Sequence, residues 1–233
     1  MVEQTIRDNL GEIHDRIAAA AARAGRSVDE IRLVAVTKKT SPGWIRALLG
    51  LGVFDLGENY PQELWRKHEE LAEFAESVHW HLIGHLQSNK VKKTLPLVKM
   101  IHAVDSLKLL RALNEAAGAL AQPPSVCLQV NTSGEESKHG WSAEAIASDC
   151  ESIAACRSIP VVGLMTMAAL GGTDESARAS FASLRATRDL LRRHTGLPLP
   201  ELSMGMSGDF ETAILEGATL VRIGSALFEG LER

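Results

Sequence analysis

A pair of adjacent lysines follows an apolar run in the segment VAVTKK, residues 34–39. The two-residue alternation of a strand places Val36 and Lys38 on one face and Lys39 on the other. A lysine at the inward end of a strand is partly removed from water, which favours the neutral amine that forms a Schiff base with an aldehyde. Lys38 is therefore our candidate nucleophile. The alternative, which composition alone favours, is a solvated lysine pair that precedes a helix.

Glycine and serine are concentrated in two segments near the end of the chain, residues 203–214 and 219–228. The positions that define them are Ser203, Gly205, Ser207, Gly208, Gly224 and Ser225. Backbone N–H groups at the start of a helix, with the positive end of its dipole, bind phosphate. Arg222 lies beside them and carries a positive charge. These segments predict a phosphate site; the alternative is that the serines only cap helices and Arg222 pairs with a carboxylate of the fold.

Two weaker motifs precede these segments, LGENY at residues 56–60 and HWHLIGHLQSNK at residues 79–90. Asn59 offers hydrogen-bonding groups after a glycine, but an ordinary turn before a helix explains the motif equally well. Histidines such as His81 and His85 are common metal ligands. No cysteine, aspartate or glutamate completes a ligand set within the motif, so we interpret each histidine as hydrogen-bonded and expect no metal.

Eight short apolar runs alternate with segments of helical periodicity, and these elements must position the motifs. The runs, interpreted as strands, are residues 32–37, 53–56, 79–83, 100–104, 126–131, 161–165, 201–204 and 219–223. Serine, threonine or aspartate begins several of the helices between them. The expected helix starts are Ser41–Pro42, Asp105 or Ser106, Ser142, Thr173 or Asp174, and Ser207, with Gly196 ending the fourth. A further helix is expected over residues 5–24.

Strict alternation of strands and helices predicts a parallel sheet, because parallel neighbours need a crossover connection. Eight such units in 233 residues favour a single (β/α)8 TIM barrel of the α/β class with an extra N-terminal helix. An open doubly wound sheet is the alternative that periodicity leaves open. No serine- or glycine-rich linker divides the chain, so we expect residues 1–233 to form one domain. In a barrel, the four motifs would meet at the C-terminal ends of the strands.

The composition is that of an ordinary globular chain, with 45% hydrophobic and 23% charged residues. A formal net charge of −4 indicates no general attraction to nucleic acid or to an anionic membrane. The three cysteines form no CxxC motif, which favours reduced, buried thiols and a cytoplasmic location. We see neither a signal peptide nor an apolar stretch of membrane-spanning length.

Six motifs occur in a fixed order along nearly the whole chain. They are VAVTKK (34–39), LGENYPQE (56–63), HLIGHLQSNK (81–90), GLMTM (163–167), LSMGMSGD (202–209) and VRIG (221–224). In this order they resemble the YggS/PROSC family of pyridoxal 5′-phosphate (PLP) homeostasis proteins. The resemblance implies PLP as the cofactor and a barrel like the N-terminal domain of alanine racemase, which is PLP fold type III.

The resemblance also implies roles for individual residues. Lys38 matches the lysine that forms the internal aldimine, and Arg222 matches the arginine that faces the pyridine nitrogen. Positions around the phosphate and beside the ring complete the implied set: Ser203, Ser207, Gly224 and Ser225, then Asn59, His85, Met165 and Met204. The sequence departs from the family's common VSKTKP because Lys39 directly follows Lys38, although alternation favours Lys38. A secondary role for Lys39, or for Lys138 in a region where family members carry a lysine, stays open.

The residues favour a carrier over an enzyme. An arginine beside the pyridine nitrogen weakens the electron sink on which PLP catalysis depends. A two-base racemase needs an acid or base on the other face of the cofactor, and this chain has one tyrosine, Tyr60, beside the turn at Asn59. We expect a non-catalytic monomer that stores PLP and delivers it by transient contact to PLP-requiring apo-enzymes. The alternatives are a PLP-dependent amino-acid racemase of low activity, and an aldolase or isomerase barrel that uses Lys38.

Overall fold

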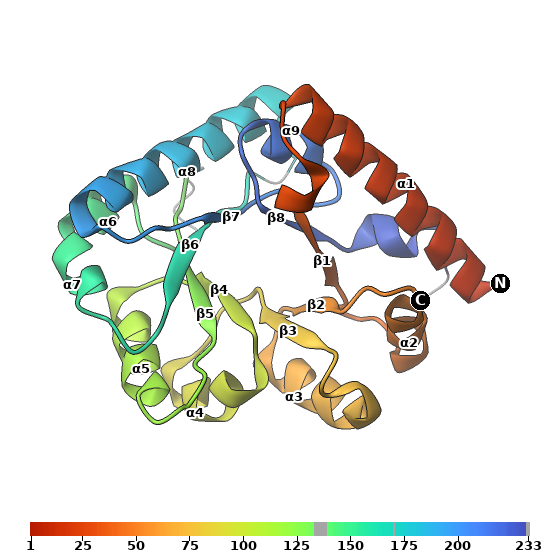
Figure 1. The fold of residues 1–233 in the computed structure, drawn as a ribbon, viewed down its shortest axis with the longest axis horizontal. Helices are drawn as coiled ribbons and strands as arrows, with labels where there is room; N and C mark the ends of the chain where they lie inside the picture. Colours follow the sequence, from red (N-terminus) through yellow and green to blue (C-terminus); the bar gives the residue numbers. More distant parts are fainter. Residues whose placement is uncertain (133–138, 170, 232–233) are drawn as a thin grey trace.

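Eight parallel strands close into a barrel in which each strand pairs with the next and the last pairs with the first. The computed structural model describes residues 1–132, 139–169 and 171–231. Figure 1 shows the strands at the centre of the molecule with helices around them. The expected (β/α)8 barrel with an extra N-terminal helix is therefore confirmed, and the open sheet is excluded.

The elements follow one another along the described residues in the order that the sequence pattern predicts. The strands are β1 Arg32–Val36, β2 Asp55–Glu58, β3 His79–Leu82, β4 Met100–Val104, β5 Ser125–Gln129, β6 Val161–Met165, β7 Glu201–Ser203 and β8 Leu220–Ile223. The α-helices are α1 Val2–Arg23, α2 Pro42–Gly50, α3 Pro61–Glu70, α4 Val91–Thr94, α5 Leu107–Ala117, α6 Ala143–Ser148, α7 Cys150–Ala154, α8 Asp174–Thr195 and α9 Phe210–Leu215. The short 3₁₀ helices are η1 Val28–Glu30, η2 Ala72–Phe74, η3 Ser88–Lys90, η4 Leu95–Leu97 and η5 Ser225–Phe228.

The second strand lies two residues later than the apolar pattern predicts, at 55–58 instead of 53–56. The register explains the shift, because Asp55 pairs with His79 and Glu58 pairs with Leu82. Gly52 has φ +84° in the turn before this strand, which favours glycine. The correction places Glu58 within the barrel wall, where it is buried, and not in an exposed turn.

Side-chain caps begin three of the helices where serine or threonine predicts them. Ser106, Ser142 and Thr173 each accept a hydrogen bond from a backbone N–H in the first turn of α5, α6 and α8, respectively. The left-handed Gly196 ends α8, as expected. The prediction that Ser207 begins the last crossover helix is wrong, because α9 starts at Phe210 and its N-cap residue is Asp209. Ser207 instead lies in the loop after β7, where its side chain has other partners.

Two apolar clusters hold the barrel together. The larger one fills the space between the strands and the surrounding helices. The smaller one contains side chains from five strands and therefore lies inside the barrel: Val34, Met100, Ala103, Cys127, Met165 and Leu220. Polar residues replace apolar ones toward the C-terminal end of the interior, where Ser203 and Arg222 are buried.

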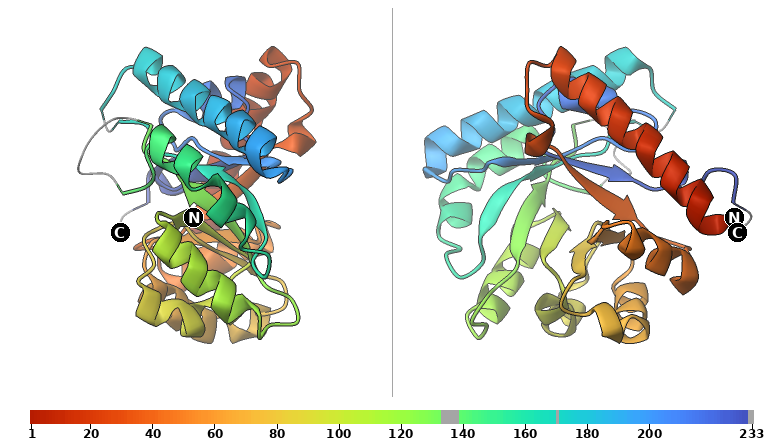
Figure 2. Two further views of the ribbon diagram at one scale, coloured as in Figure 1. Left: turned by 90° about the vertical axis from the view of Figure 1, so that its left-hand side faces the viewer. Right: turned by 45° about the vertical axis from the view of Figure 1, so that its right-hand side comes forward.

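The N-terminal helix α1 lies across the outside of the barrel against α2, α9 and η5 (Figure 2). Its buried positions have helical spacing and are Ile6, Leu10, Ile13, Ile17, Ala20 and Ala21. Arg16 forms an ion pair with Glu211 of α9 at 2.7 Å. Asn9 donates hydrogen bonds to two backbone carbonyls beside η5, at Leu227 and Glu229. The helix therefore braces the part of the barrel that contains β8.

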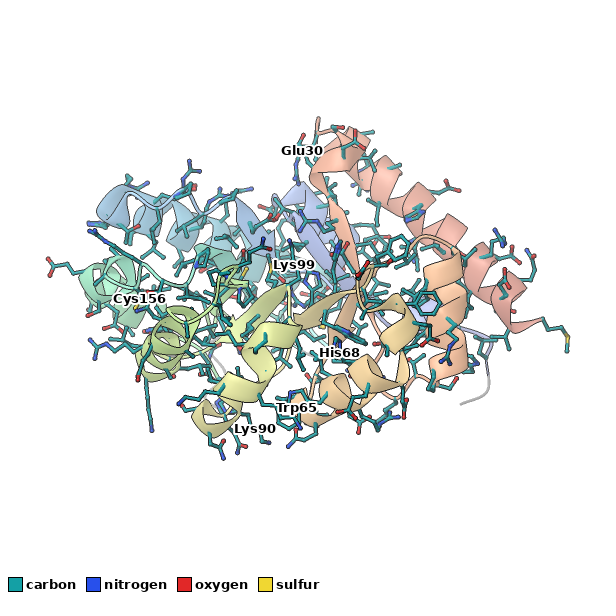
Figure 3. All side chains as sticks on the ribbon, turned by 60° about the horizontal axis from the view of Figure 1, so that its bottom comes forward. Glu30, Trp65, His68, Lys90, Lys99 and Cys156 are labelled. Atoms are coloured by element: carbon teal, nitrogen blue, oxygen red, sulfur yellow. The ribbon has the colours of Figure 1, made fainter. Side chains whose placement is uncertain are left out.

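On the opposite side, α3 and α4 are joined by Thr94. Its hydroxyl accepts a hydrogen bond from the Trp65 indole at 3.3 Å and donates one to the Lys90 carbonyl at 2.8 Å. Trp65 and Lys90 lie together at one edge of the molecule, far from Glu30 before β1 (Figure 3). Lys93 lies over the Trp65 ring at 4.2 Å from its centroid.

No helix in the described part of the chain combines the length and the apolar character that crossing a lipid bilayer requires. The three cysteines are free thiols, with Cys127 and Cys150 buried and Cys156 half-buried. Burial raises the pKa of all three.

Candidate binding site at the mouth of the barrel

A cavity of about 340 Å³ opens at the C-terminal ends of the strands. Its lining comes from the end of β1, from the segments that follow β1, β2, β3, β6 and β7, and from β8 with the turn after it. The lining residues are Val36, Lys38, Asn59, Ile83, Met167, Met206, Ser207, Gly208, Arg222, Gly224 and Ser225. One primary amine, one guanidinium and two hydroxyl groups therefore meet on an otherwise largely apolar surface.

Lys38 reaches this cavity from a turn and not from the strand itself. Strand β1 ends at Val36, and Lys38 and Lys39 form a turn in which the Thr40 N–H donates to the Thr37 carbonyl at 2.9 Å. The side chain of Lys38 is exposed, which corrects the expectation that it is partly buried. Lys39 has φ +60°, a strained value for a residue other than glycine, and it does not line the cavity.

A buried ion pair supports this turn from below. Lys67 of α3 pairs with Glu58 of β2, and both side chains are 1% exposed. The Lys67 ammonium also donates to the Thr37 carbonyl at 2.6 Å, and the Thr37 hydroxyl donates to Glu58 at 2.7 Å. The residue before Lys38 is thus bonded through both its backbone and its side chain. Sequence reasoning missed this group, because a lysine in an amphipathic helix ordinarily faces water.

Arg222 of β8, the strand that pairs with β1, also lines the cavity and is 4% exposed. Its Nη1 donates to the Ser203 hydroxyl at 2.6 Å, and its Nη2 donates to the Thr166 carbonyl at 2.9 Å. Burial lowers its pKa to about 10, and the charge of Asp209 opposes that shift. The guanidinium stays charged at neutral pH. Within the described chain no carboxylate pairs with it directly, so the alternative of a barrel ion pair is not what holds Arg222.

Hydrogen bonds continue from Ser203 through the barrel interior. The Ser203 hydroxyl lies 2.7 Å from His102 Nδ1, and His102 Nε2 lies 2.8 Å from His81 Nδ1. His81 Nε2 lies 2.8 Å from Asp55. Burial lowers the pKa of both histidines, and for His102 the neighbouring His81 and Arg222 act in the same direction. Sequence reasoning singled out His81 but missed His102, although a histidine inside the apolar strand MIHAV was a usable signal.

Two backbone N–H groups converge on one oxygen at the β7–β8 side of the cavity. The Ser207 hydroxyl accepts from the Gly224 N–H at 3.3 Å and from the Ala226 N–H at 3.4 Å. A Cβ at Gly224 would lie 3.2 Å from the Val36 Cβ, so a side chain at this position would crowd Val36. Converging N–H groups of this kind bind the oxygens of anions. The loops after β7 and β8 can therefore hold a phosphate, although α9 begins farther along the chain than expected.

Comparison with known proteins bears on what this cavity holds. Residues 9–232 match the family described as alanine racemase, N-terminal domain. A protein of Pseudomonas aeruginosa named pyridoxal phosphate homeostasis protein is 40% identical over 224 residues, which are 96% of this chain and 95% of that protein. This chain belongs to the alanine racemase N-terminal domain family and, within it, to the pyridoxal phosphate homeostasis proteins. A family member from Homo sapiens is 37% identical over 94% of this chain and 84% of its own length. The resemblance drawn from the six motifs is confirmed.

Two solved structures extend the comparison. PipY of Synechococcus elongatus, solved with PLP bound, is 35% identical with a TM-score of 0.82 over 93% of this chain and 99% of that one. Alanine racemase of Corynebacterium glutamicum is 20% identical with a TM-score of 0.70, over 96% of this chain and 63% of that one. At that identity the racemase supports the barrel fold alone, and the fold agrees with the expected type.

Four residues of the predicted set do not line the cavity: Ser203, Met165, Met204 and His85. Ser203 is buried beneath Arg222, and Met165 lies in the apolar cluster inside the barrel. Met204 packs in the outer core, because alternation turns it away from its neighbour Ser203. Met167, two residues after Met165 on the same side of the chain, reaches the cavity instead. Val36, Ile83 and Met206 line the cavity without having been predicted, and Gly208 of the predicted phosphate segments lines it as well.

His85 lines a second cavity of about 320 Å³ that shares Asn59 with the first. Its Nδ1 lies 2.7 Å from Asp105, and its ring stacks on His139 with centroids 5.3 Å apart. No group of three histidine, cysteine, aspartate or glutamate side chains in the described ranges is arranged to hold a metal. Lys138 lies outside the described residues.

A larger groove of about 570 Å³ lies outside the barrel, between α4 and α5. Most of its lining is apolar or aliphatic, and it shares no residue with the cavity at the mouth of the barrel. Its lining does not combine a nucleophile with an anion-binding group. The smaller cavity is therefore the candidate site.

Proposed function

We propose that this chain holds PLP at the mouth of the barrel, with Lys38 as the covalent anchor, and takes part in intracellular vitamin B6 homeostasis without classical catalysis. The observation that carries the proposal is the presence of an amine, a guanidinium and converging N–H groups in one cavity. The name of the Pseudomonas aeruginosa relative and the PLP bound to PipY support the same cofactor.

The residues present fit this cofactor. A cavity of about 340 Å³ is within the range of small-ligand sites. Gly224 keeps the space beside Val36 free of a side chain, so that the backbone can approach an anion closely. The phosphate would accept from the Gly224 and Ala226 N–H groups in place of the Ser207 oxygen, with the hydroxyls of Ser207 and Ser225 beside it.

Lys38 and Arg222 would act at the other end of the ligand. Lys38 would supply the amine that condenses with the aldehyde of the ligand, with water as the leaving group, and so join the ligand to the chain. Arg222 would lie toward the pyridine nitrogen and would disfavour a second positive charge there. PLP supplies an electron sink when its ring nitrogen is protonated, and the charge of Arg222 opposes that protonation. Arg222 therefore suits retention of the cofactor better than carbanion chemistry.

The surroundings of Tyr60 also favour a carrier. The chain contains one tyrosine, and its side chain is 63% exposed. It lines the second cavity with His85 and is absent from the lining of the first. A two-base mechanism needs an acid or base aimed at the reacting carbon from each face. Amino-acid racemase activity at a low rate is the alternative, because the second cavity shares Asn59 with the first.

The proposal extends to the setting of this function. We infer that residues 1–233 act as one PLP-binding domain, as a monomer in the cytoplasm that meets apo-enzymes transiently. Free thiols fit a reducing compartment. Large apolar side chains that are exposed in the described chain are few and scattered: Met1, Val2, Val28, Phe54 and Tyr60.

The visible absorbance spectrum tests the covalent anchor. Wild type incubated with PLP is expected to show a Schiff-base absorbance band. Borohydride should bleach this band and leave the reduced ligand bound to the protein. Lys38→Ala should lack the band, because its side chain has no amine. Lys39→Ala is the matched control and should keep it, since Lys39 does not line the cavity. A colourless wild type would overturn the proposal. So would a band that Lys39→Ala lacks and Lys38→Ala retains.

A second measurement separates carrier from enzyme. The loaded protein should transfer PLP to an apo-enzyme of a PLP-dependent family and restore its activity. It should not turn over single L- or D-amino acids above the rate of free PLP. Stereospecific turnover by wild type that Lys38→Ala loses would favour the racemase alternative.

A further inference from the structure

One continuous chain of hydrogen bonds crosses the barrel interior and ends on the cavity. It starts at Asp55, the first residue of β2, and passes through His81 of β3 and His102 of β4. It then reaches Ser203 at the end of β7 and Arg222 of β8. We call these five residues the interior chain. The proposed function uses only its last member, Arg222.

The two ends of the interior chain have fixed roles. The Arg222 guanidinium only donates, so the Ser203 oxygen accepts from it at 2.6 Å. The Asp55 carboxylate only accepts, so His81 Nε2–H donates to it. With both buried imidazoles neutral, His81 Nδ1 accepts from His102 Nε2–H, and His102 Nδ1 accepts the Ser203 hydrogen. In this assignment all four bonds point from Arg222 toward Asp55.

We propose that His102 is a positioning residue for Arg222, acting through Ser203, and that Asp55 and His81 select the tautomer that this role requires. The inference rests on the proposed function for its ligand. His102 touches neither the cavity nor any reacting atom. Its role is to hold the Ser203 hydrogen so that the oxygen lone pairs face the guanidinium.

Burial makes this role necessary. His81, His102 and Ser203 are each 0% exposed, so water does not replace a missing partner. Without an acceptor at His102, the Ser203 hydrogen turns freely and can point at the guanidinium, where like partial charges repel. Arg222 would then keep only the Thr166 carbonyl among its two partners. Its direction toward the cavity would be less well defined.

The far end of the interior chain fixes the tautomers. Asp55 is the only carboxylate among the described residues that hydrogen-bonds a member of this chain, and its side chain is 24% exposed. His79 Nδ1 also lies 3.5 Å from Asp55. The charged groups that face the two histidines from neighbouring strands are Asp55, His79, Arg32 and Arg222. The Asp55 carboxylate accepts the Nε2–H of His81, which leaves Nδ1 free to accept from His102.

Nitrogen NMR on the cofactor-free protein tests the interior chain directly. Protein labelled with ¹⁵N at histidine should show two neutral Nε2–H imidazoles at pH 7, assigned to His81 and His102 by single substitutions. Ser203→Ala should perturb the His102 signals more than those of His81. A protonated His102, or an Nδ1–H tautomer on either ring, would overturn the proposal whether or not the protein binds PLP.

Ligand affinity tests the positioning role. His102→Leu removes the acceptor and should weaken PLP binding about tenfold, since one bond to a charged donor becomes disordered. His102→Asn retains an oxygen near the Nδ1 position and should restore affinity to within about threefold of wild type. The cofactor band of His102→Leu should shift in wavelength while that of His102→Asn should not. Circular dichroism and melting temperature identify folded variants.

Every outcome of these experiments counts for or against the positioning role of His102. Folded His102→Leu with wild-type affinity and spectrum would exclude the positioning role. If His102→Leu does not fold, the comparison of His102→Asn with Ser203→Ala replaces it, and equal losses in both would also exclude the role. A wild type that fails to bind PLP would contradict the proposed function, while the NMR result would still decide whether the interior chain exists.

Discussion

Two buried cations lie near the cavity, Lys67 behind its wall and Arg222 in its lining, and they are held in different ways. Lys67 beneath the Lys38 turn has a carboxylate partner, Glu58, at the same depth. Arg222 has a hydroxyl and a carbonyl as hydrogen-bond partners and, within the described chain, no carboxylate bonded to it. Lys67 is therefore neutralised inside the protein, whereas the charge of Arg222 is available to the cavity.

The difference separates a structural charge from a functional one. The ammonium of Lys67 donates to the Thr37 carbonyl, so it fixes the backbone from which Lys38 projects. Lys38 itself is exposed and able to meet an incoming aldehyde. Arg222, by contrast, is fixed by neutral groups that accept its hydrogen bonds. The cavity thus contains an exposed reactive group on a braced turn and a charge whose position is fixed beforehand.

The largest expected effect comes from removing the structural charge. Lys67→Met leaves the buried Glu58 carboxylate without its cation and should lower the free energy of unfolding by about 3–5 kcal/mol. Urea unfolding of the cofactor-free protein measures it. The matched control is the preceding residue of α3, Arg66→Ala, whose ion pairs with Glu63 and Glu70 are exposed and contribute about 0–1 kcal/mol. Equal losses in both variants would contradict the distinction between the two cations.

The two buried histidines behind Arg222, His81 and His102, should make the folding stability depend on pH. Burial lowers the pKa of His81 and His102 below the ordinary histidine value of about 6.5, so the unfolded chain binds protons there that the folded one refuses. Folding stability should therefore fall as the pH drops below about 6.5, with a limiting slope of about 2.7 kcal/mol per pH unit for two histidines. Urea midpoints between pH 5 and pH 8 measure the slope.

A variant separates the contribution of the two histidines to the pH dependence of stability from that of other titrating groups. His102→Asn removes one of the two buried imidazoles, so the limiting slope should fall by about half. The lowered pKa of Asp55 does not contribute in this window, because its stabilisation is lost only as the pH falls below about 3.8. A stability that stays flat down to pH 5 would show that the folded protein admits protons to the interior chain.

The fold followed from the sequence because its signals are local. Alternating apolar runs and helical segments predicted the eight-stranded barrel, and residues such as Ser106, Thr173 and Gly196 marked helix ends correctly. The second strand was misplaced by two residues because Val53 and Phe54 are apolar and Glu58 is charged. Pairing of Glu58 with Leu82 and burial of its ion pair with Lys67 overrode composition.

The site was predictable where motifs name lining residues directly. Lys38, Asn59, Ser207, Arg222, Gly224 and Ser225 all meet in one cavity, and each follows a strand or lies at its end. Depth along the barrel axis was not predictable, because alternation gives the face of a strand and not the height. Met165 and Met167 share a face, yet only Met167 reaches the cavity. Long-range bonds such as His102 to Ser203 join residues 101 positions apart and have no local signal.

The smallest expected effect on stability is at Arg222, and it separates the two cations most sharply. The fall of its pKa from 12.5 to about 10 corresponds to a burial cost on the order of 3 kcal/mol at neutral pH, because the fold disfavours the charged form. Arg222→Met removes that cost together with two hydrogen bonds from a charged donor that stabilise by about 1.5–3 kcal/mol each. The two terms oppose each other, so the free energy of unfolding should fall by about 0–3 kcal/mol, which is less than for Lys67→Met. PLP affinity should fall in the same variant. A loss of stability as large as that of Lys67→Met would mean that Arg222 is a structural charge after all, and that its direction toward the cavity is a consequence of folding.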